Sequence, residues 1–135
     1  MKEQLLTLTD TSRQYTLEVA EAMPENKFNE KPVDEVWSFR ELMHHIAYGI
    51  EWWEVNYVRG IETAWEPVAA SKNKKEVIAY LGKAYESLQK AIKELPMKEE
   101  SVKGVHSTLD HITHHRGQAV LHLRLQGIEP PGYVY

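Results

Sequence analysis

Residues 38–53 read SFRELMHHIAYGIEWW and carry the clearest helix start in this chain. Ser38 is followed three residues later by Glu41, which is the spacing of a capping box: the serine hydroxyl accepts a backbone N–H, and the carboxylate reaches back to the cap. The residues that share one stripe of the following helix are Leu42, His45, Gly49, Trp52 and Asn56, with Ile46, Trp53 and Tyr57 beside it. This spacing predicts an amphipathic helix that ends near Arg59 and Gly60.

Two other segments show the same period of three and four residues. One is the first helix of the chain, which runs from about Lys2 to Met23, and the residues on its stripe are Leu5, Leu8, Ser12, Tyr15, Val19 and Met23. The other is the third helix, which begins at Asn73, where a capping pair with Glu76 can form, and ends at Pro96. Its apolar positions are Val77, Leu81, Ala84 or Tyr85, Leu88, Ala91 or Ile92, and Leu95.

The last helix is expected to start around Ser107, with Asp110 at the capping-box position, and to run to about Gln126. Gly127 is well placed to terminate it, and two prolines at 130 and 131 prevent its resumption. The tail PPGYVY is rich in aromatic residues, and we expect it to pack across the molecule or against a second subunit.

The fold class that follows is all-α. No segment alternates as a strand does, and long connections, residues 23–37 and 60–73, follow the first and second helices. Four amphipathic helices with crossover loops indicate a four-helix bundle. With no repeat and no second composition class, residues 1–135 are expected to form a single domain.

Composition excludes several classes of protein. The formal net charge of -4 argues against a nucleic-acid-binding protein, which needs a basic surface. The absence of cysteine excludes disulfides, thiolate metal ligands and a cysteine nucleophile. No apolar run approaches the length of a membrane span, and the first residues do not resemble a secretion signal. We therefore expect a cytoplasmic protein without a membrane partner.

Residues 110–118, DHITHHRGQ, hold three of the seven histidines. Helical residues four apart lie on the same face, so His111 and His115 project side by side, as two ligands of one ion can. His122 returns to that arc two turns later, whereas His114 lies to one side. The zinc-protease pattern H-E-x-x-H is absent because Ile112 follows His111.

His45 of the second helix is the candidate third ligand. Gly49, one turn beyond it, removes a side chain where an open coordination position would need space. Three histidines with a free position are typical of catalytic rather than structural metal sites. The alternative is that the histidines are surface or hydrogen-bonded core residues, that Gly49 marks a close helix crossing, and that the tryptophans are core.

The segments SFRELMHHIAYGIEWW and DHITHHRGQAVLHLRLQGIEPPGYVY together resemble the DinB/YfiT-like family. The resemblance covers nearly the whole chain and is most specific in H-x-x-x-H-R-G-Q. It implies a four-helix bundle in an up-up-down-down arrangement and a divalent metal, commonly nickel or zinc. Its ligands would be His45, His111 and His115, and homodimers are common among relatives.

The neighbours of these histidines have several possible roles. His122 could line a pocket, shuttle protons or simply pack, and as a fourth ligand it would weaken a catalytic interpretation. Arg116 is expected to pair with a carboxylate near the surface, and Gly117 to allow close backbone approach. Gln118 could hydrogen-bond a ligand imidazole.

Two chemistries fit such a site: hydrolysis by a metal-bound hydroxide, and transfer or isomerisation involving a low-molecular-weight thiol. The resemblance favours the second, since characterised relatives include thiol-dependent S-transferases and isomerases. No residue can be assigned as a general base, because Asp110 points about 100° away from His111. Trp52, Trp53 and Tyr48 could line an apolar substrate pocket or belong to the core. A metal-binding or stress-response protein without turnover remains the alternative.

Overall fold

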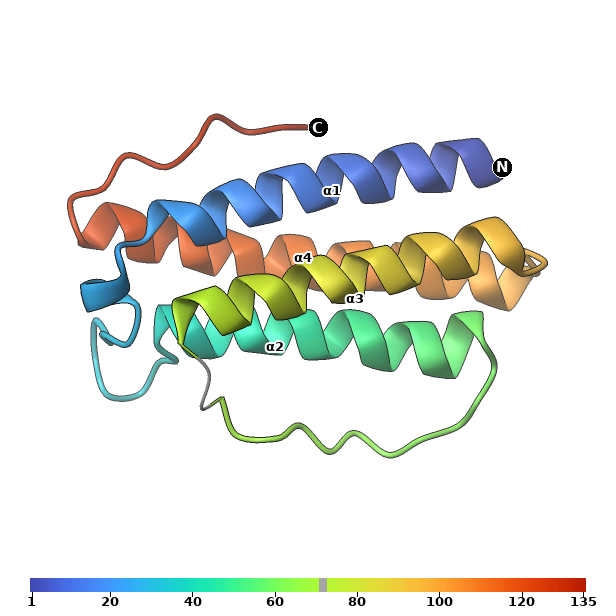
Figure 1. Ribbon diagram of the computed structural model, residues 1–135, viewed down its shortest axis with the longest axis horizontal. Coiled ribbons are helices and arrows are strands. Elements are labelled where there is room, and N and C mark those ends of the chain that lie inside the picture. The colour runs from blue at the N-terminus through green and yellow to red at the C-terminus, as the bar shows by residue number, and fades with distance from the viewer. Residues whose placement is uncertain (71–72) are drawn as a thin grey trace.

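The computed structural model describes residues 1–70 and 73–135, and within them all regular structure is helical. The four long helices are α1 (Lys2–Ala22), α2 (Phe39–Trp53), α3 (Lys74–Glu94) and α4 (Glu99–Leu125), shown in Figure 1. A short 3-10 turn, η1 (Glu25–Lys27), follows α1, and a π-helical turn, η2 (Glu54–Val58), extends α2. The predicted all-α four-helix bundle is confirmed.

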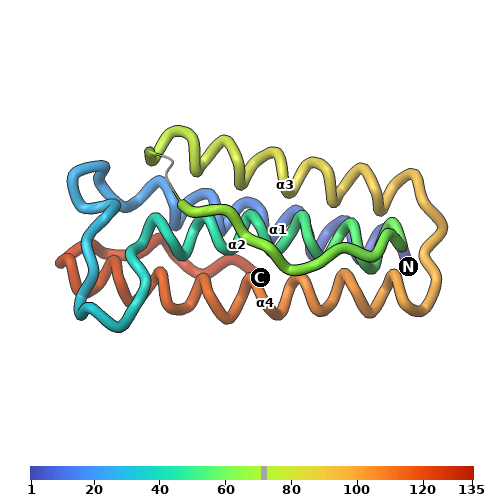
Figure 2. The backbone as a smooth tube through the Cα atoms, turned by 90° about the horizontal axis from the view of Figure 1, so that it is seen from below, coloured from blue at the N-terminus to red at the C-terminus, as the bar shows by residue number. Residues whose placement is uncertain are grey.

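The order of helix directions is up-down-down-up, so the expected up-up-down-down arrangement is wrong (Figures 1 and 2). Residues 23–38 stay at one end of the bundle and reverse the chain between α1 and α2. Residues 59–70 instead run back along the length of α2, which makes α3 parallel to α2. The ends of α1 and α3 agree with this order: Lys2 Nζ donates to the carbonyl of Lys93, and Lys74 pairs with Glu21.

The helix starts are set by the predicted caps in two cases and not in the third. Ser38 and Glu41 form both hydrogen bonds of the capping box, and the Asn73 side chain accepts the backbone N–H of Glu76. The last helix begins at Glu99 rather than near Ser107, and Asp110 lies exposed in mid-helix. The chain re-enters a helix directly after the Pro96 turn, and acidic residues in the first turn of α4 favour that start.

The end of α4 has the geometry that the glycine predicts. Gly127 has a positive φ of 74°, and its N–H donates to the carbonyl of Arg124 at 3.0 Å. The N–H of Ile128 donates to Leu123 at 2.9 Å, which completes a Schellman motif. Beyond it the tail crosses the bundle beside α1, where the Tyr133 ring packs edge-on against Tyr15 (Figure 1).

The interior follows the predicted stripes closely on α1 and α3 but only in part on α2. On α2 the predicted Leu42, Ile46 and Gly49 are buried, Trp52 and Asn56 are only partly buried, and Met43, Ala47 and Ile50 join the core instead. The α3 stripe from Val77 to Ile92 is buried as expected. On α1, Leu8 is exposed and Thr9 is buried in its place, with its hydroxyl donating to the carbonyl of Leu5 at 2.6 Å. The threonine satisfies its own polar group within the helix and can therefore face the core.

Arg116 is buried and does not reach a carboxylate at the surface, contrary to expectation. Its guanidinium lies 4.7 Å from the centre of the Tyr15 ring and donates to the Thr16 hydroxyl at 3.1 Å. Ser12 and Thr16 in turn share the Tyr85 hydroxyl, each at 2.9 Å. Hydrogen bonds and a cation–π contact between α1, α3 and α4 therefore take the place of a counterion.

In the part of the chain that the structure describes, no helix combines the length and apolarity needed to cross a membrane.

Candidate metal centre

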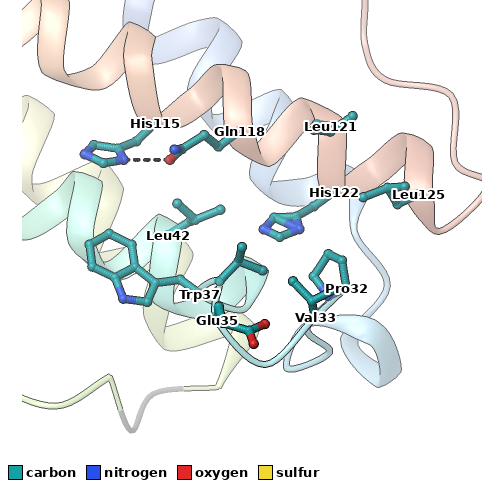
Figure 3. A pocket seen from close by; sticks show the side chains of 11 residues that line it. Pro32, Val33, Glu35, Trp37, Leu42, His115, Gln118, Leu121, His122 and Leu125 are labelled. Carbon is teal, nitrogen blue, oxygen red and sulfur yellow. Dashed lines mark hydrogen bonds between the residues drawn. The ribbon is translucent and has the colours of Figure 1, made fainter.

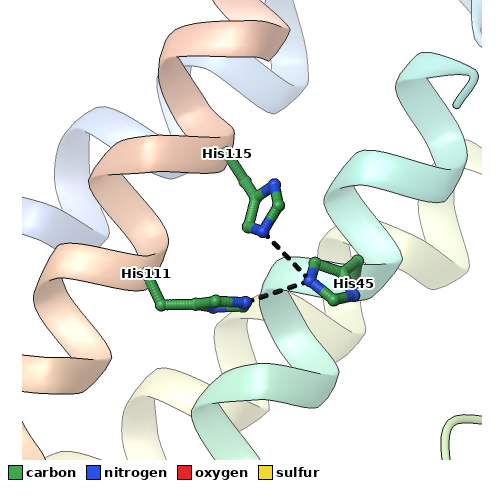
Figure 4. A group of neighbouring side chains, drawn as sticks. All are labelled: His45, His111 and His115. Atoms are coloured by element: carbon green, nitrogen blue, oxygen red, sulfur yellow. Dashed lines mark hydrogen bonds between the residues drawn. The ribbon is translucent and has the colours of Figure 1, made fainter. Parts of the chain in front are cut away.

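His45 of α2 and His111 and His115 of α4 converge on one point between the two helices (Figure 4). The Nε2 atom of His45 lies 3.0 Å from that of His111 and 3.1 Å from that of His115. The i,i+4 spacing on α4 supplies two of these imidazoles, and the crossing of α2 supplies the third. The geometry thus brings together the three histidines that the sequence singles out.

The space for the His111 ring is provided by Gly49. A Cβ atom on Gly49 would lie 2.5 Å from Cε1 and 2.7 Å from Nδ1 of His111. The expectation that Gly49 leaves room for an open coordination position is therefore wrong, because the histidine's own imidazole fills that room. Gly117 does not mark a close approach either, since a Cβ there would meet nothing within 4 Å.

The orientation of His115 is fixed by Gln118, as predicted. His115 Nδ1 lies 2.9 Å from Gln118 Oε1, so Nδ1–H donates (Figure 3). The Nε2 atom of His115 then carries the lone pair, and it lies 3.1 Å from His45 Nε2. His45 Nε2 can donate to that lone pair or accept from His111, but it cannot do both. One of the two short nitrogen–nitrogen contacts thus lacks a proton unless a cation sits between the rings.

Protonation does not resolve this conflict at neutral pH. Burial, with His115 and His111 adjacent, lowers the pKa of His45 to about 4. Burial and the neighbouring His115 and His114 lower the pKa of His111 to about 4 as well. Burial also lowers the pKa of His115, although its bond to Gln118 acts in the opposite direction. Three neutral imidazoles that face one another offer the nitrogen lone pairs that could hold a divalent metal ion.

The spacing of the donor atoms fits one ion. Imidazole nitrogens about 2.0–2.1 Å from a metal lie roughly 3 Å apart at right angles and slightly farther apart at tetrahedral angles. The two separations that involve His45, 3.0 and 3.1 Å, match this requirement, and the three ligand atoms all lie within 4.8 Å of one another. Among the described residues no carboxylate joins the group, and neither does His122, which lies two turns farther along α4.

Two indole rings flank the histidines, and neither was predicted to lie there. Trp37 lies 4.6 Å from His45 and 5.8 Å from His115, ring centre to ring centre. Trp65 lies 5.6 Å from His45 and 6.3 Å from His111. Trp37 directly precedes the capping box, which is a signal that could have found it. Trp65 comes from an irregular segment that gives no such signal.

Trp65 belongs to a segment that we call the strap, residues 59–70, which has no regular secondary structure and runs along α2 (Figure 1). Side chains spaced one helical turn apart along α2 and η2 form hydrogen bonds with successive residues of the strap. Asn56 exchanges two hydrogen bonds with Thr63, Trp52 Nε1 donates to Ala64, Tyr48 accepts the N–H of Glu66, and His44 Nε2 donates to Val68. From Trp52 to His44, each step of four helical residues rises about 6 Å and is matched by two strap residues, which span about 6.6 Å when extended, so the two segments stay in register there. The step from Asn56 to Trp52 is matched by one strap residue, from Thr63 to Ala64.

This ladder gives a role to aromatic residues that the sequence could not distinguish from core. Tyr48 and Trp52 pack against Trp65, with ring centres 4.8 and 5.3 Å apart. Trp53 stacks on Tyr57 at 4.8 Å, and it lies outside the group around the histidines. The predicted pocket of Trp52, Trp53 and Tyr48 is therefore replaced by a platform that supports Trp65.

Comparison with known proteins agrees with this architecture. The model of the DinB superfamily matches residues 8–123. A crystal structure of a DinB-like protein from Bacillus cereus has a TM-score of 0.77 and 16% identity, covering 96% of this chain and 95% of that one. A DinB-like protein from Bacillus subtilis has a TM-score of 0.76 and 18% identity, covering 97% and 98%. No curated protein sequence matches the chain. The match over most of its length shows that the chain belongs to the DinB superfamily.

Proposed function

We propose that His45, His111 and His115 bind one divalent metal ion, nickel or zinc, and that the protein is a metal-dependent enzyme for thiol-dependent transfer or isomerisation. The observation that carries the proposal is the convergence of three neutral Nε2 atoms at 3.0 and 3.1 Å, which the imidazoles cannot satisfy among themselves. We further propose that residues 1–135 form one DinB-like domain and that it assembles as a homodimer.

A divalent ion held by three neutral ligands keeps its full charge and would lower the pKa of a coordinated thiol or water. The chain's own residues prepare the site. Gln118 holds the His115 tautomer, Gly49 admits the His111 ring, and the half-exposed rings of Trp37 and Trp65 limit access of water to His45. These contacts orient the ligands before any ion arrives.

Thiol chemistry is preferred to hydrolysis because of the side chains near the three histidines. No carboxylate belongs to it among the described residues, so a general base for water is not at hand. A low-molecular-weight thiol has an ordinary pKa near 8.5 and is easier to deprotonate than water. The small-molecule substrate is therefore proposed to react with a thiol cosubstrate.

Metal content tests the proposal. Protein purified without a histidine tag should contain about one nickel or zinc ion per chain, as one three-histidine site requires. His45→Ala, His111→Ala and His115→Ala should each lose it. His106→Ala and His114→Ala alter exposed histidines outside the group and serve as controls. A wild-type protein that takes up neither metal would refute the proposal.

An activity screen then separates the two chemistries. Cysteine, coenzyme A and glutathione can be offered with a model electrophile, and ester and amide substrates without a thiol. Thiol-dependent turnover that disappears on chelation and returns with metal supports transfer. Turnover of the esters without any thiol would favour the hydrolase. A loaded protein that turns over neither set is the outcome expected of a non-catalytic metal-binding protein.

A further inference from the structure

A cavity of about 510 Å³ lies beside the three histidines, between residues 32–37 and the second half of α4 (Figure 3). His115 forms part of its wall, so a molecule in the cavity would lie next to the proposed metal. Its volume falls within the range of small-molecule sites, which is about 300–1,000 Å³. The strap lies on the other side of His45 and does not line it.

The walls of the cavity are apolar and open to water. Val33 and Leu121 face it from opposite sides and are 54% and 58% exposed, and the half-exposed Trp37 stands between it and His45. Contiguous apolar surface of this kind is uncommon on a protein unless something covers it. A bound organic group would remove these side chains from water.

One buried polar group points into this apolar space. His122 is only 8% exposed, and its side chain projects from α4 into the cavity (Figure 3). Its imidazole makes no hydrogen bond to any described residue. The ring nitrogens of His122 are not among the described side-chain atoms that are buried without a partner, so solvent in the cavity reaches them. The hydroxyl of a bound ligand would take the place of that water as the hydrogen-bond partner.

Charge narrows the class of ligand. Glu35 is the single ionised side chain among the described residues that line the cavity. Its carboxylate disfavours an anionic occupant and is compatible with a neutral one.

We propose that this cavity binds the organic part of the substrate: a neutral, largely apolar molecule with one hydroxyl that hydrogen-bonds His122. The proposal rests on the proposed function only in placing that molecule beside a metal. The binding itself needs no ion and is measured separately.

Three matched ligands test it: 1-naphthol, naphthalene, which lacks the hydroxyl, and 1-naphthalenesulfonate, which is anionic. Binding is followed by equilibrium dialysis on the protein as purified, with metal content determined in the same samples. We expect naphthol to bind about fivefold more tightly than naphthalene, which is the worth of one hydrogen bond. The sulfonate should bind more weakly than either.

The following variants distinguish the contribution of the cavity walls to binding from that of the hydrogen bond to His122. Leu121→Trp and Val33→Trp narrow the cavity from two sides and should weaken naphthol by about tenfold or more. Leu8→Trp makes the same change at an exposed leucine on α1 and should have no effect. His122→Leu should abolish the preference for naphthol over naphthalene. Imidazole NMR adds an independent readout, since naphthol should shift the ring signals of His122 and His115 but not those of His106.

The possible results are distinguishable. Equal affinity of wild type and both tryptophan variants, or a naphthol preference that survives His122→Leu, overturns the inference. Naphthol binding that obeys these predictions in a protein without metal supports the cavity and refutes only the metal site. A protein that binds metal but none of the three ligands retains the proposed function and loses this inference.

Discussion

Gly49→Ala is the substitution for which the structure makes the sharpest prediction. The added Cβ would lie 2.5 Å from Cε1 of His111, whereas ordinary contacts begin at 3.4 Å, so the ring must move by about 0.9 Å. Metal–nitrogen bonds vary by only about 0.2 Å around their usual length. The displaced imidazole therefore cannot keep its place, and we expect metal affinity to fall by about tenfold to a hundredfold.

The same substitution distinguishes the effect of packing on stability from that of helix propensity. Alanine is favoured over glycine in a helix by about 1 kcal/mol. At Gly82 and Gly117 a Cβ would meet nothing within 4 Å, so both alanine variants should gain that stability. At Gly49 overpacking of about 1–3 kcal/mol should cancel or reverse the gain.

The assay combines urea unfolding of metal-free protein with calorimetric titration of nickel and zinc. Gly117→Ala is the closest control, because it lies on α4 between His115 and Gln118 and touches neither α2 nor the His111 ring. A Gly49→Ala protein that is stabilised like Gly117→Ala and binds metal like wild type would refute the reasoning.

Three further predictions concern the ligands and the strap. Gln118→Ala removes the acceptor that holds the His115 tautomer; metal affinity should fall by about tenfold in calorimetry with little change in unfolding, and unchanged affinity would contradict this. In the metal-free fold the pKa of His45 and that of His111 are about 4, below the ordinary 6.5, so the unfolded chain binds more protons between these values. The free energy of unfolding, measured in urea, should therefore be highest above about pH 6.5 and should fall as the pH is lowered toward 4. A free energy of unfolding that does not change in that window would count against neutral, buried imidazoles. Tyr48→Phe removes the hydroxyl that accepts the N–H of Glu66, so hydrogen exchange at that amide should accelerate while exchange in α3 does not; equal protection would mean that the ladder does not hold the strap.

Local signals in the sequence predicted the elements that depend on local chemistry. The Ser38–Glu41 box and the Gly127 terminus need only residues within one turn, and both have the predicted geometry. The i,i+4 pair His111 and His115 likewise follows from helix geometry alone. The start of α4 was misplaced because Lys98 offers no side-chain cap, whereas Ser107 and Asp110 have the spacing of a capping box.

Features set by the packing of distant segments could not be read from the sequence. The direction of α3 depends on where residues 59–70 travel, and their composition indicates only a loop. The register of the strap depends on side chains of α2 that serve equally well as core residues. Gly49 and Gly117 look alike in the sequence, and only the position of α4 against α2 distinguishes the crowded glycine from the open one.

X-ray absorption at the metal edge tests the central claim most directly, because it counts imidazole ligands around a bound ion. For protein loaded with one equivalent of nickel or zinc, we predict three imidazole nitrogens at about 2.0–2.1 Å. His45→Ala, His111→Ala and His115→Ala should each reduce that count by one or abolish binding, whereas His114→Ala should leave it at three. A wild-type spectrum without imidazole scattering, or one that these substitutions leave unchanged, would show that the ion binds elsewhere and would contradict the account.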